Sequence, residues 1–112
     1  MNDKENYVIF ISKKLENNYN KLKNNKYFNK ELYLNIKKII INLKKDPTSG
    51  IKISKKQWPK KYIIKYRITN LWKYNLPNGW RLIYTIKSDQ IKIISIILEW
   101  FSHKNYEKKF KY

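Results

Sequence analysis

The chain has 112 residues, of which 26 are Lys or Arg, 8 are Asp or Glu, one is His and none is Cys, and its formal net charge is +18. The absence of Cys excludes disulfide frameworks, thiol nucleophiles and Cys-ligated zinc, and a single His offers no His-based metal cluster, so we expect neither metal nor cofactor. The length suits one domain spanning residues 1–112, and its apolar stretches are too short to cross a bilayer, so we expect a cytoplasmic protein without membrane contact.

The first half of the chain predicts one strand followed by two helices. Residues 7–11 form an aromatic and β-branched run, which predicts a strand buried on both faces. Ser12 can cap a helix that extends to about residue 25 and carries a narrow apolar face. A second helix with a broader apolar face begins after a cap at Asn29. It ends at residues 46–47, since Pro47 disfavours helical geometry in the residue before it.

The second half of the chain predicts a sheet. Residues 48–50 read as a loop, residues 51–57 carry no clear pattern, and Pro59 favours the start of a short third helix with Tyr62, Ile63 and Tyr66 on one side. From residue 71 the apolar period becomes two, which predicts three antiparallel strands joined by turns at residues 77–79 and 87–90. The tail, residues 102–112, is expected to be a short helix or an extended segment.

The turn at residues 77–79 predicts which side chains share a face of this sheet. If Leu76 pairs with Trp80, one face is an apolar core that packs against the two long helices, made of Trp72, Tyr74, Leu76, Trp80, Leu82, Tyr84 and Ile86. The other face carries Lys73, Asn75, Arg81, Ile83 and Thr85, joined by Lys92, Ile94, Ile96 and Leu98. We therefore predict an α+β fold in which helices cover one side of an antiparallel sheet and leave the other side partly open and concave.

The charge excess allows two interpretations. All the cationic residues except Arg67 and Arg81 are Lys, and Ala is absent, as expected of a protein encoded by AT-rich codons. Codon bias does not explain the scarcity of acids. A charge of this size attracts polyanions and raises their encounter rate, so a nucleic acid or a ribonucleoprotein is the favoured partner, ahead of an anionic membrane surface or an acidic protein.

Three residues near the C-terminal strands are candidates for chemistry. Arg81 stands in mid-strand in a chain that otherwise uses Lys almost everywhere, which suggests a need for a planar, permanently charged fork that binds phosphate or carboxylate. Alternatively, it is a surface Arg that pairs with Glu99 or only snorkels to solvent. His103 and Tyr106 are three residues apart and would point the same way on a helical turn. The alternatives are an exposed imidazole at His103 and a tail packed on the sheet through Tyr106, Phe110 and Tyr112.

These residues also carry a family resemblance. Residues 79–84 read Gly-Trp-Arg-Leu-Ile-Tyr, residues 71–74 read Leu-Trp-Lys-Tyr, and a His-x-x-Tyr tail follows the last strand. With the order strand, two helices and meander, the chain resembles the RelE/ParE superfamily of toxins from type II toxin–antitoxin modules, in particular archaeal-type RelE-like members. The first half matches in element order only, and residues 55–67 form a longer insertion than in compact members. The resemblance implies the fold and a cognate acidic antitoxin as partner.

The resemblance to RelE-like members also implies an activity and residue roles. Such proteins enter the ribosomal A site and cut mRNA without a metal, through attack of a ribose 2′-hydroxyl on the neighbouring phosphate. Arg81 would stabilise the transition state and Lys73 would face the same cleft. Tyr106 would stack on a base or assist proton transfer, and His103 would act as acid or base. The family's second strand Lys falls on Asn75, and the residues expected to bind RNA are Lys55, Lys56, Lys60, Lys61, Asn75, Lys104, Lys108 and Lys109.

Two other functions remain open from the sequence. A ParE-like protein would use the same fold to bind DNA gyrase without cutting RNA. A basic RNA- or ribosome-binding module, or an inactive relic of a toxin, would keep the fold and the charge without catalysis. The charge pattern is compatible with all three.

Overall fold

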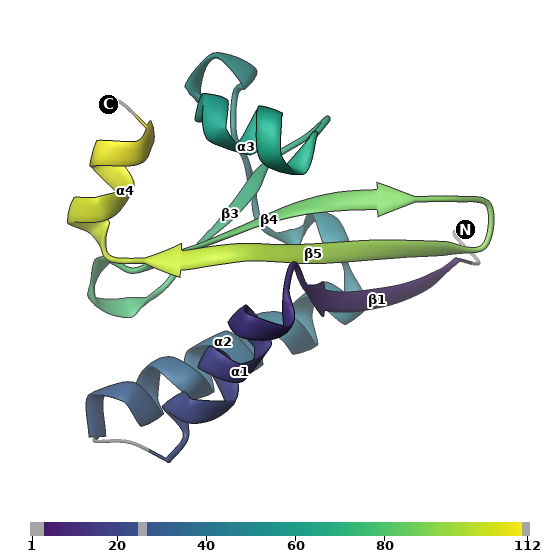
Figure 1. Cartoon of the computed structure of the whole chain (residues 1–112). Helices are drawn as coiled ribbons and strands as arrows, with labels where there is room; N and C mark the ends of the chain where they lie inside the picture. The colour runs from purple at the N-terminus through teal and green to yellow at the C-terminus, as the bar shows by residue number, and fades with distance from the viewer. Residues whose placement is uncertain (1–3, 25–26, 111–112) are drawn as a thin grey trace.

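The computed structural model describes residues 4–24 and 27–110. Within these residues the chain forms an α+β fold with four α-helices and a five-stranded mixed sheet whose strand order is β1-β5-β4-β3-β2. Helices α1 and α2 lie on one side of the sheet, while α3 and α4 lie on the other (Figure 1). Among the described residues, no helix combines the length and the apolar composition that a membrane span requires.

The first strand corrects two predictions. Strand β1 (Glu5–Phe10) lies at the edge of the sheet and pairs with β5 in parallel, so the sheet is not wholly antiparallel. The strand is also not buried on both faces, because Tyr7 and Ile9 are 44% and 47% exposed. Their neighbours Val8 and Phe10 pack towards α1 and α2. The exposed side is the one that α3 and α4 cover elsewhere, and these short helices do not reach the edge strand.

Helices α1 (Lys13–Leu22) and α2 (Tyr27–Lys45) follow the predicted order. The Ser12 cap is confirmed, because its hydroxyl oxygen accepts a hydrogen bond from the Leu15 amide at 3.1 Å. The Asn29 cap is wrong, since α2 already includes this residue: a local capping signal is weak beside the packing of a long amphipathic helix. The end of α2 before Pro47 is confirmed. Asp46 then caps a 3-10 turn over Pro47–Ser49, where a plain loop was expected.

The remaining elements build the rest of the sheet and its second cover. They are β2 (Ile51–Lys52), a 3-10 turn (Lys55–Gln57), α3 (Lys60–Tyr66), β3 (Trp72–Asn75), a 3-10 turn (Pro77–Gly79), β4 (Arg81–Ser88), β5 (Lys92–Phe101) and α4 (His103–Phe110). The antiparallel meander β3-β4-β5 is confirmed, and the tail is helical. Strand β2, which pairs with β3, was not predicted, because two residues are too short for a visible alternation. Tyr112 lies outside the described residues.

The turn between β3 and β4 sets the register of the meander. The Leu76 amide donates to the Trp80 carbonyl at 2.8 Å, as predicted. Asn78 and Gly79 both adopt the left-handed region, with φ of 62° and 78°, which Asn tolerates and Gly adopts freely. A Cβ atom at Gly79 would lie 3.0 Å from the Cβ of His103. Glycine therefore lets this turn approach the first residue of α4.

Each face of the sheet carries its own core, although the outer side of β1 stays exposed. The predicted apolar face is confirmed: Leu76, Leu82 and Tyr84 pack in one core with the α2 residues Ile36 and Leu43. The opposite face is not the open surface that was expected. There Ile83, Ile96, Leu98 and Phe101 are covered by Tyr62 of α3 and by Tyr106 and Phe110 of α4. Aromatic residues in the two short helices supply this second core.

A β-bulge in the pairing of β4 with β5 changes which side chains of β5 share a face. Ile83 pairs with Glu99, but the next residue, Tyr84, pairs with Ile97, so Leu98 has no residue opposite. Strict alternation would place Glu99 on the same face as Ile97. Instead, the irregularity places Glu99 with Ile83, on the side that α3 and α4 cover.

Candidate functional site

The four residues to which the resemblance assigned catalysis lie together, although three separate elements carry them. Lys73 comes from β3, Arg81 from β4, and His103 and Tyr106 from α4. The Lys73 Nζ donates to the Tyr106 hydroxyl at 3.1 Å, and an Nη2 of Arg81 lies 3.3 Å from the His103 Nδ1. The Arg81 guanidinium carbon is 5.7 Å from the Tyr106 ring centroid. We call these four residues the Arg81 cluster.

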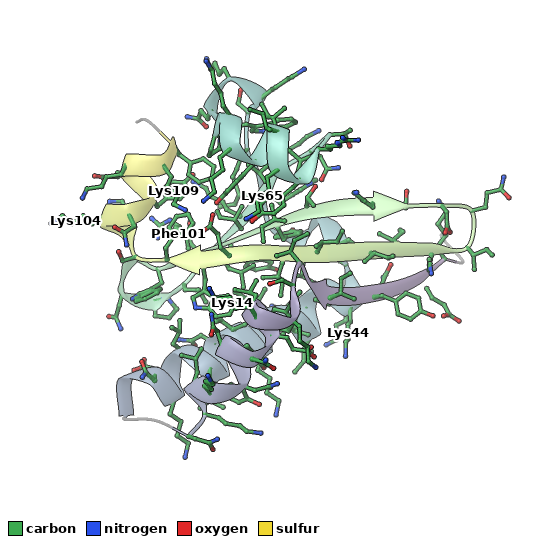
Figure 2. The ribbon with its side chains drawn as sticks, in the orientation of Figure 1. Lys14, Lys44, Lys65, Phe101, Lys104 and Lys109 are labelled. Carbon is green, nitrogen blue, oxygen red and sulfur yellow. The ribbon has the colours of Figure 1, made fainter. Side chains whose placement is uncertain are left out.

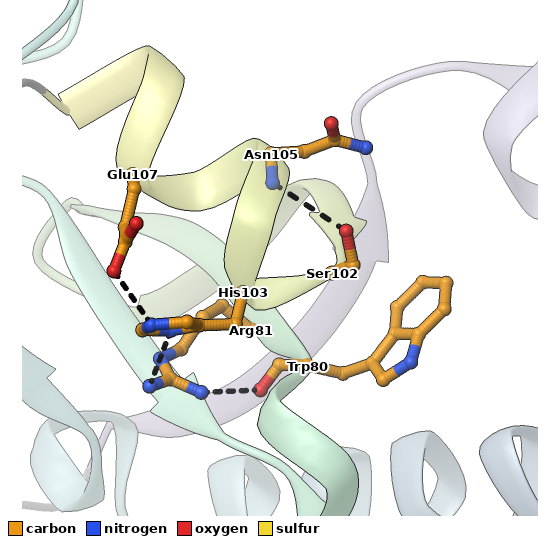
Figure 3. Close-up of polar contacts among 6 residues, drawn as sticks. All are labelled: Trp80, Arg81, Ser102, His103, Asn105 and Glu107. Carbon is orange, nitrogen blue, oxygen red and sulfur yellow. Dashed lines mark hydrogen bonds and ion pairs between the residues drawn. The ribbon is translucent and has the colours of Figure 1, made fainter.

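Strand register and the start of α4 bring this cluster together. Lys73 pairs with Ile83 and Asn75 with Arg81, so Lys73 and Arg81 are diagonal neighbours on one face of two adjacent strands. At the next pair, Arg81 lies opposite Phe101 of β5. Helix α4 begins two residues later, and the Tyr106 amide donates to the Ser102 carbonyl at 2.9 Å. The first turn of α4 therefore stands directly beside Arg81 (Figure 3).

Arg81 keeps its charge uncompensated by a carboxylate. One guanidinium nitrogen, Nη1, donates to the Trp80 carbonyl at 3.1 Å and Nη2 contacts His103, while the buried Nε has no hydrogen-bond partner. Within the described residues no acid forms an ion pair with it, so the expected alternative, a pair with Glu99, is wrong. A half-buried guanidinium without a carboxylate partner is suited to bind an anion.

His103 lies between Arg81 and Glu107, a residue that sequence reasoning missed. An Arg can only donate, so the His103 Nδ1 accepts in this arrangement and the ring proton sits on Nε2. Nε2 lies 2.7 Å from the Glu107 Oε1 (Figure 3). The i,i+4 spacing of His103 and Glu107 was the signal that could have revealed this pair. An imidazole oriented by a carboxylate can take up a proton at its other nitrogen.

Tyr106 has a more restricted environment than the resemblance implied. It is 1% exposed, and its ring stacks on Phe110 at 4.5 Å and on Phe101 at 6.0 Å between centroids. The Lys73 Nζ lies 4.8 Å from the same ring centroid. Stacking of an RNA base on Tyr106 has no room in this arrangement, whereas its hydroxyl is in place to exchange a proton with Lys73.

A second polar cluster anchors α4 and is distinct from the Arg81 cluster. The Lys109 Nζ donates to both oxygens of Glu99, at 2.9 and 3.1 Å, and the Tyr62 hydroxyl donates to the same carboxylate. Burial and the nearby Glu99 charge raise the pKa of Tyr62, so it stays protonated and donates. Lys109 was predicted to bind RNA, but its charge is balanced here by Glu99 and helps to hold α4 on β5 and α3.

The other residues predicted to bind RNA lie on exposed surfaces around this region. Lys60 and Lys61, at the start of α3, join Pro59, Tyr62 and Lys109 around a cavity of about 290 Å³. In Figure 2, Lys104 lies on the side of α4 away from α3, whereas Lys109 lies on the side that faces it. Lys55 and Lys56 in the 3-10 turn, Lys108 on α4, and Asn75 beside Arg81 are exposed. The structure thus does not gather them into one patch.

The Arg81 cluster can bind an anion and move protons with its own side chains. Among the described residues, no group of three or more His, Asp or Glu side chains is arranged to hold a metal ion. Comparison of the chain with protein-family models, curated proteins and solved structures found no match.

Proposed function

We propose that this protein is a RelE-like endoribonuclease that cuts mRNA on the ribosome and so inhibits translation. The observation that carries the proposal is the Arg81 cluster: two cations, a carboxylate-oriented imidazole and a tyrosine hydroxyl meet on one face of β3 and β4. These are the groups that transfer of a phosphodiester to a neighbouring hydroxyl requires: a base, an acid and stabilisation of charge on the phosphate oxygens.

In the proposed reaction, the 2′-oxygen of a ribose forms a bond to the adjacent phosphorus while the bond from phosphorus to the 5′-oxygen breaks. Arg81 turns its Nη2 donor to the phosphate, which releases the His103 Nδ1 to take the proton of the 2′-hydroxyl. Glu107 then pairs with the resulting imidazolium. The Lys73–Tyr106 pair supplies the proton to the leaving 5′-oxygen. The products are a 2′,3′-cyclic phosphate and a 5′-hydroxyl.

The proposal extends to the family arrangement and the partners. The order β1, α1, α2, then β3-β4-β5 and α4, supports a RelE/ParE-like arrangement. A net charge of +18 supports long-range attraction to ribosomal RNA, and it supports an acidic antitoxin whose charge would neutralise the basic surface. The ribosome and mRNA place the activity in the cytoplasm.

The test is a reconstituted translation assay in which primer extension maps cuts in an mRNA held in the ribosomal A site. We expect cleavage by the wild-type chain and a loss on the order of 10²–10³-fold for Arg81→Ala, as for removal of one group that stabilises transition-state charge. His103→Ala and Tyr106→Phe should also reduce the rate. Lys14→Ala is the matched control, because Lys14 lies on α1, across the sheet from the cluster (Figure 2).

Two outcomes would overturn this proposal in favour of the other functions. Intact mRNA in the presence of wild-type protein that still binds ribosomes, with a steep salt dependence, would indicate a non-catalytic binding module. Inhibition of gyrase supercoiling without RNA cleavage would indicate a ParE-like activity.

A further inference from the structure

A second cavity, of about 210 Å³, lies at the free edge of β3. Strand β2 pairs only with Trp72 and Lys73, so the rest of β3 has no strand on its outer side. Residues of helix α2 line the cavity from the other side. Its lining includes Asn35, Lys38 and Asn42 of α2, together with Tyr74 and Asn75 at the end of β3.

Within the described residues, three amide side chains that line this cavity have no hydrogen-bond partner. Asn35 and Asn42 lie two turns apart on α2, half-buried, and the exposed Asn75 lines the cavity from β3. By contrast, the half-buried Asn70 side chain donates to the Ile86 carbonyl and accepts from the Ile86 amide, so its amide is satisfied within the fold. Across the part of the chain that the structure describes, these three amides therefore keep donors and acceptors for a ligand.

The chemistry of the lining favours a purine base. An Asn amide offers a donor and an acceptor side by side and pairs bidentately with N6 and N7 of adenine, and a Lys binds O6 and N7 of guanine. Lys38 is exposed, and both Lys38 and Tyr74 line the cavity. Single-stranded RNA is read in this way, by bases that leave the stack, meet an aromatic side chain and form hydrogen bonds along their edges.

Asn75 links the cavity to the Arg81 cluster, because it is the direct pairing partner of Arg81 across β3 and β4. Paired residues of antiparallel strands have Cα atoms about 4.5–5.5 Å apart. We propose that the cavity is a recognition pocket for a purine of single-stranded RNA, next to the phosphate that Arg81 holds. The substrate class rests on the proposed function, whereas the pocket itself can be tested without catalysis.

The first experiment observes the side-chain amides directly, by ¹⁵N NMR of the full chain titrated with single compounds. AMP and GMP should shift the amide signals of Asn35, Asn42 and Asn75, while inorganic phosphate, CMP and UMP should shift them much less. The double variant Asn35→Ala, Asn42→Ala should weaken purine binding about tenfold or more. Asn20→Ala, an exposed change on α1, is the control and should leave it unchanged. Alanine is favourable in helices, so the variants should fold.

The proposed purine pocket would be contradicted if purine and pyrimidine nucleotides shifted the amide signals equally. It would also be contradicted if inorganic phosphate alone reproduced these shifts. A second experiment separates the pocket from the nuclease. If the wild type cleaves mRNA, the double variant should cut with a broader distribution of neighbouring bases. Purine-specific amide shifts without any RNA cleavage would support the pocket and contradict the nuclease. Cleavage with an unchanged base distribution and no amide shifts would support the nuclease and contradict the pocket.

Discussion

Lys109 of α4 binds Glu99 of β5 through both carboxylate oxygens, at 2.9 and 3.1 Å. The same carboxylate accepts the Tyr62 hydroxyl of α3, so one acid joins three elements on the side of the sheet that carries the Arg81 cluster. Helix α4 also carries His103 and Tyr106. The Lys109–Glu99 pair therefore holds these two residues in place from the opposite end of the helix. The Lys109–Glu99 pair has a structural role, and we expect its loss to disturb the Arg81 cluster.

The first prediction concerns the stability that Glu99 provides. Glu99→Ala leaves the Lys109 ammonium and the Tyr62 hydroxyl without their acceptor and should lower the free energy of unfolding by about 1–3 kcal/mol. Urea unfolding followed by tryptophan fluorescence measures the change. Glu16→Ala is the control, since Glu16 forms only an exposed pair with Lys13 and should cost less than about 1 kcal/mol. Equal losses in both variants would contradict the anchoring role.

The second prediction concerns Gly79. Gly79→Ala adds a methyl group at a φ of 78° and 3.0 Å from the His103 Cβ, so the turn or α4 must move. We expect a loss of about 1–3 kcal/mol, measured by thermal unfolding, together with shifted NMR signals for α4. Asn78→Gly is the control in the same turn and should be neutral or slightly stabilising, because Asn78 also has a positive φ. Unchanged signals for α4 would argue against the close approach.

The third prediction concerns acid stability. The Asp89 carboxylate accepts hydrogen bonds from the Ile91 and Lys92 amides at 2.7 and 2.9 Å, which lowers its pKa in the folded chain. Its stabilising effect is thus complete above the unfolded pKa of about 4 and is lost as the pH falls through the lower folded value.

In Asp89→Asn the contribution of this carboxylate disappears, so stability should fall less steeply between about pH 5 and pH 2 than in the wild type. Urea unfolding at a series of pH values measures this slope. Asp46→Asn should behave in the same way, because Thr48 hydrogen bonds lower the pKa of Asp46. Superimposable profiles for the wild type and Asp89→Asn would refute the assignment.

The fourth prediction separates attraction from catalysis. Lys60 and Lys61 border one cavity with Lys109 but lie outside the Arg81 cluster. The double variant Lys60→Ala, Lys61→Ala should weaken binding of single-stranded RNA and reduce the slope of log K against log salt by about 1.4, if each Lys contacts one phosphate. Fluorescence anisotropy at several salt concentrations measures the slope. A double change on α2, Lys37→Ala with Lys44→Ala, controls for net charge and should change the slope less.

Local sequence patterns determined the meander and its faces. Period-two alternation from residue 71 and a turn compatible with positive φ at Asn78 and Gly79 were enough to place Lys73 and Arg81 on one side of two paired strands. Turn geometry and alternation act over a few residues, so they can be read without knowing what lies elsewhere. The Ser12 cap and the end of α2 at Pro47 were predictable for the same reason.

Only the tertiary structure decided what covers each face. The parallel edge position of β1, the burial of Tyr106 of α4 against the sheet, and the placement of Glu99 beneath α3 and α4 all depend on contacts between distant segments. The bulge opposite Ile83 and Tyr84 is one example, because a single extra residue in β5 changes which of its side chains share a face. The net charge of +18 follows from the sequence, but packing determines that Glu99 pairs with Lys109 and that, within the described residues, no acid pairs with Arg81.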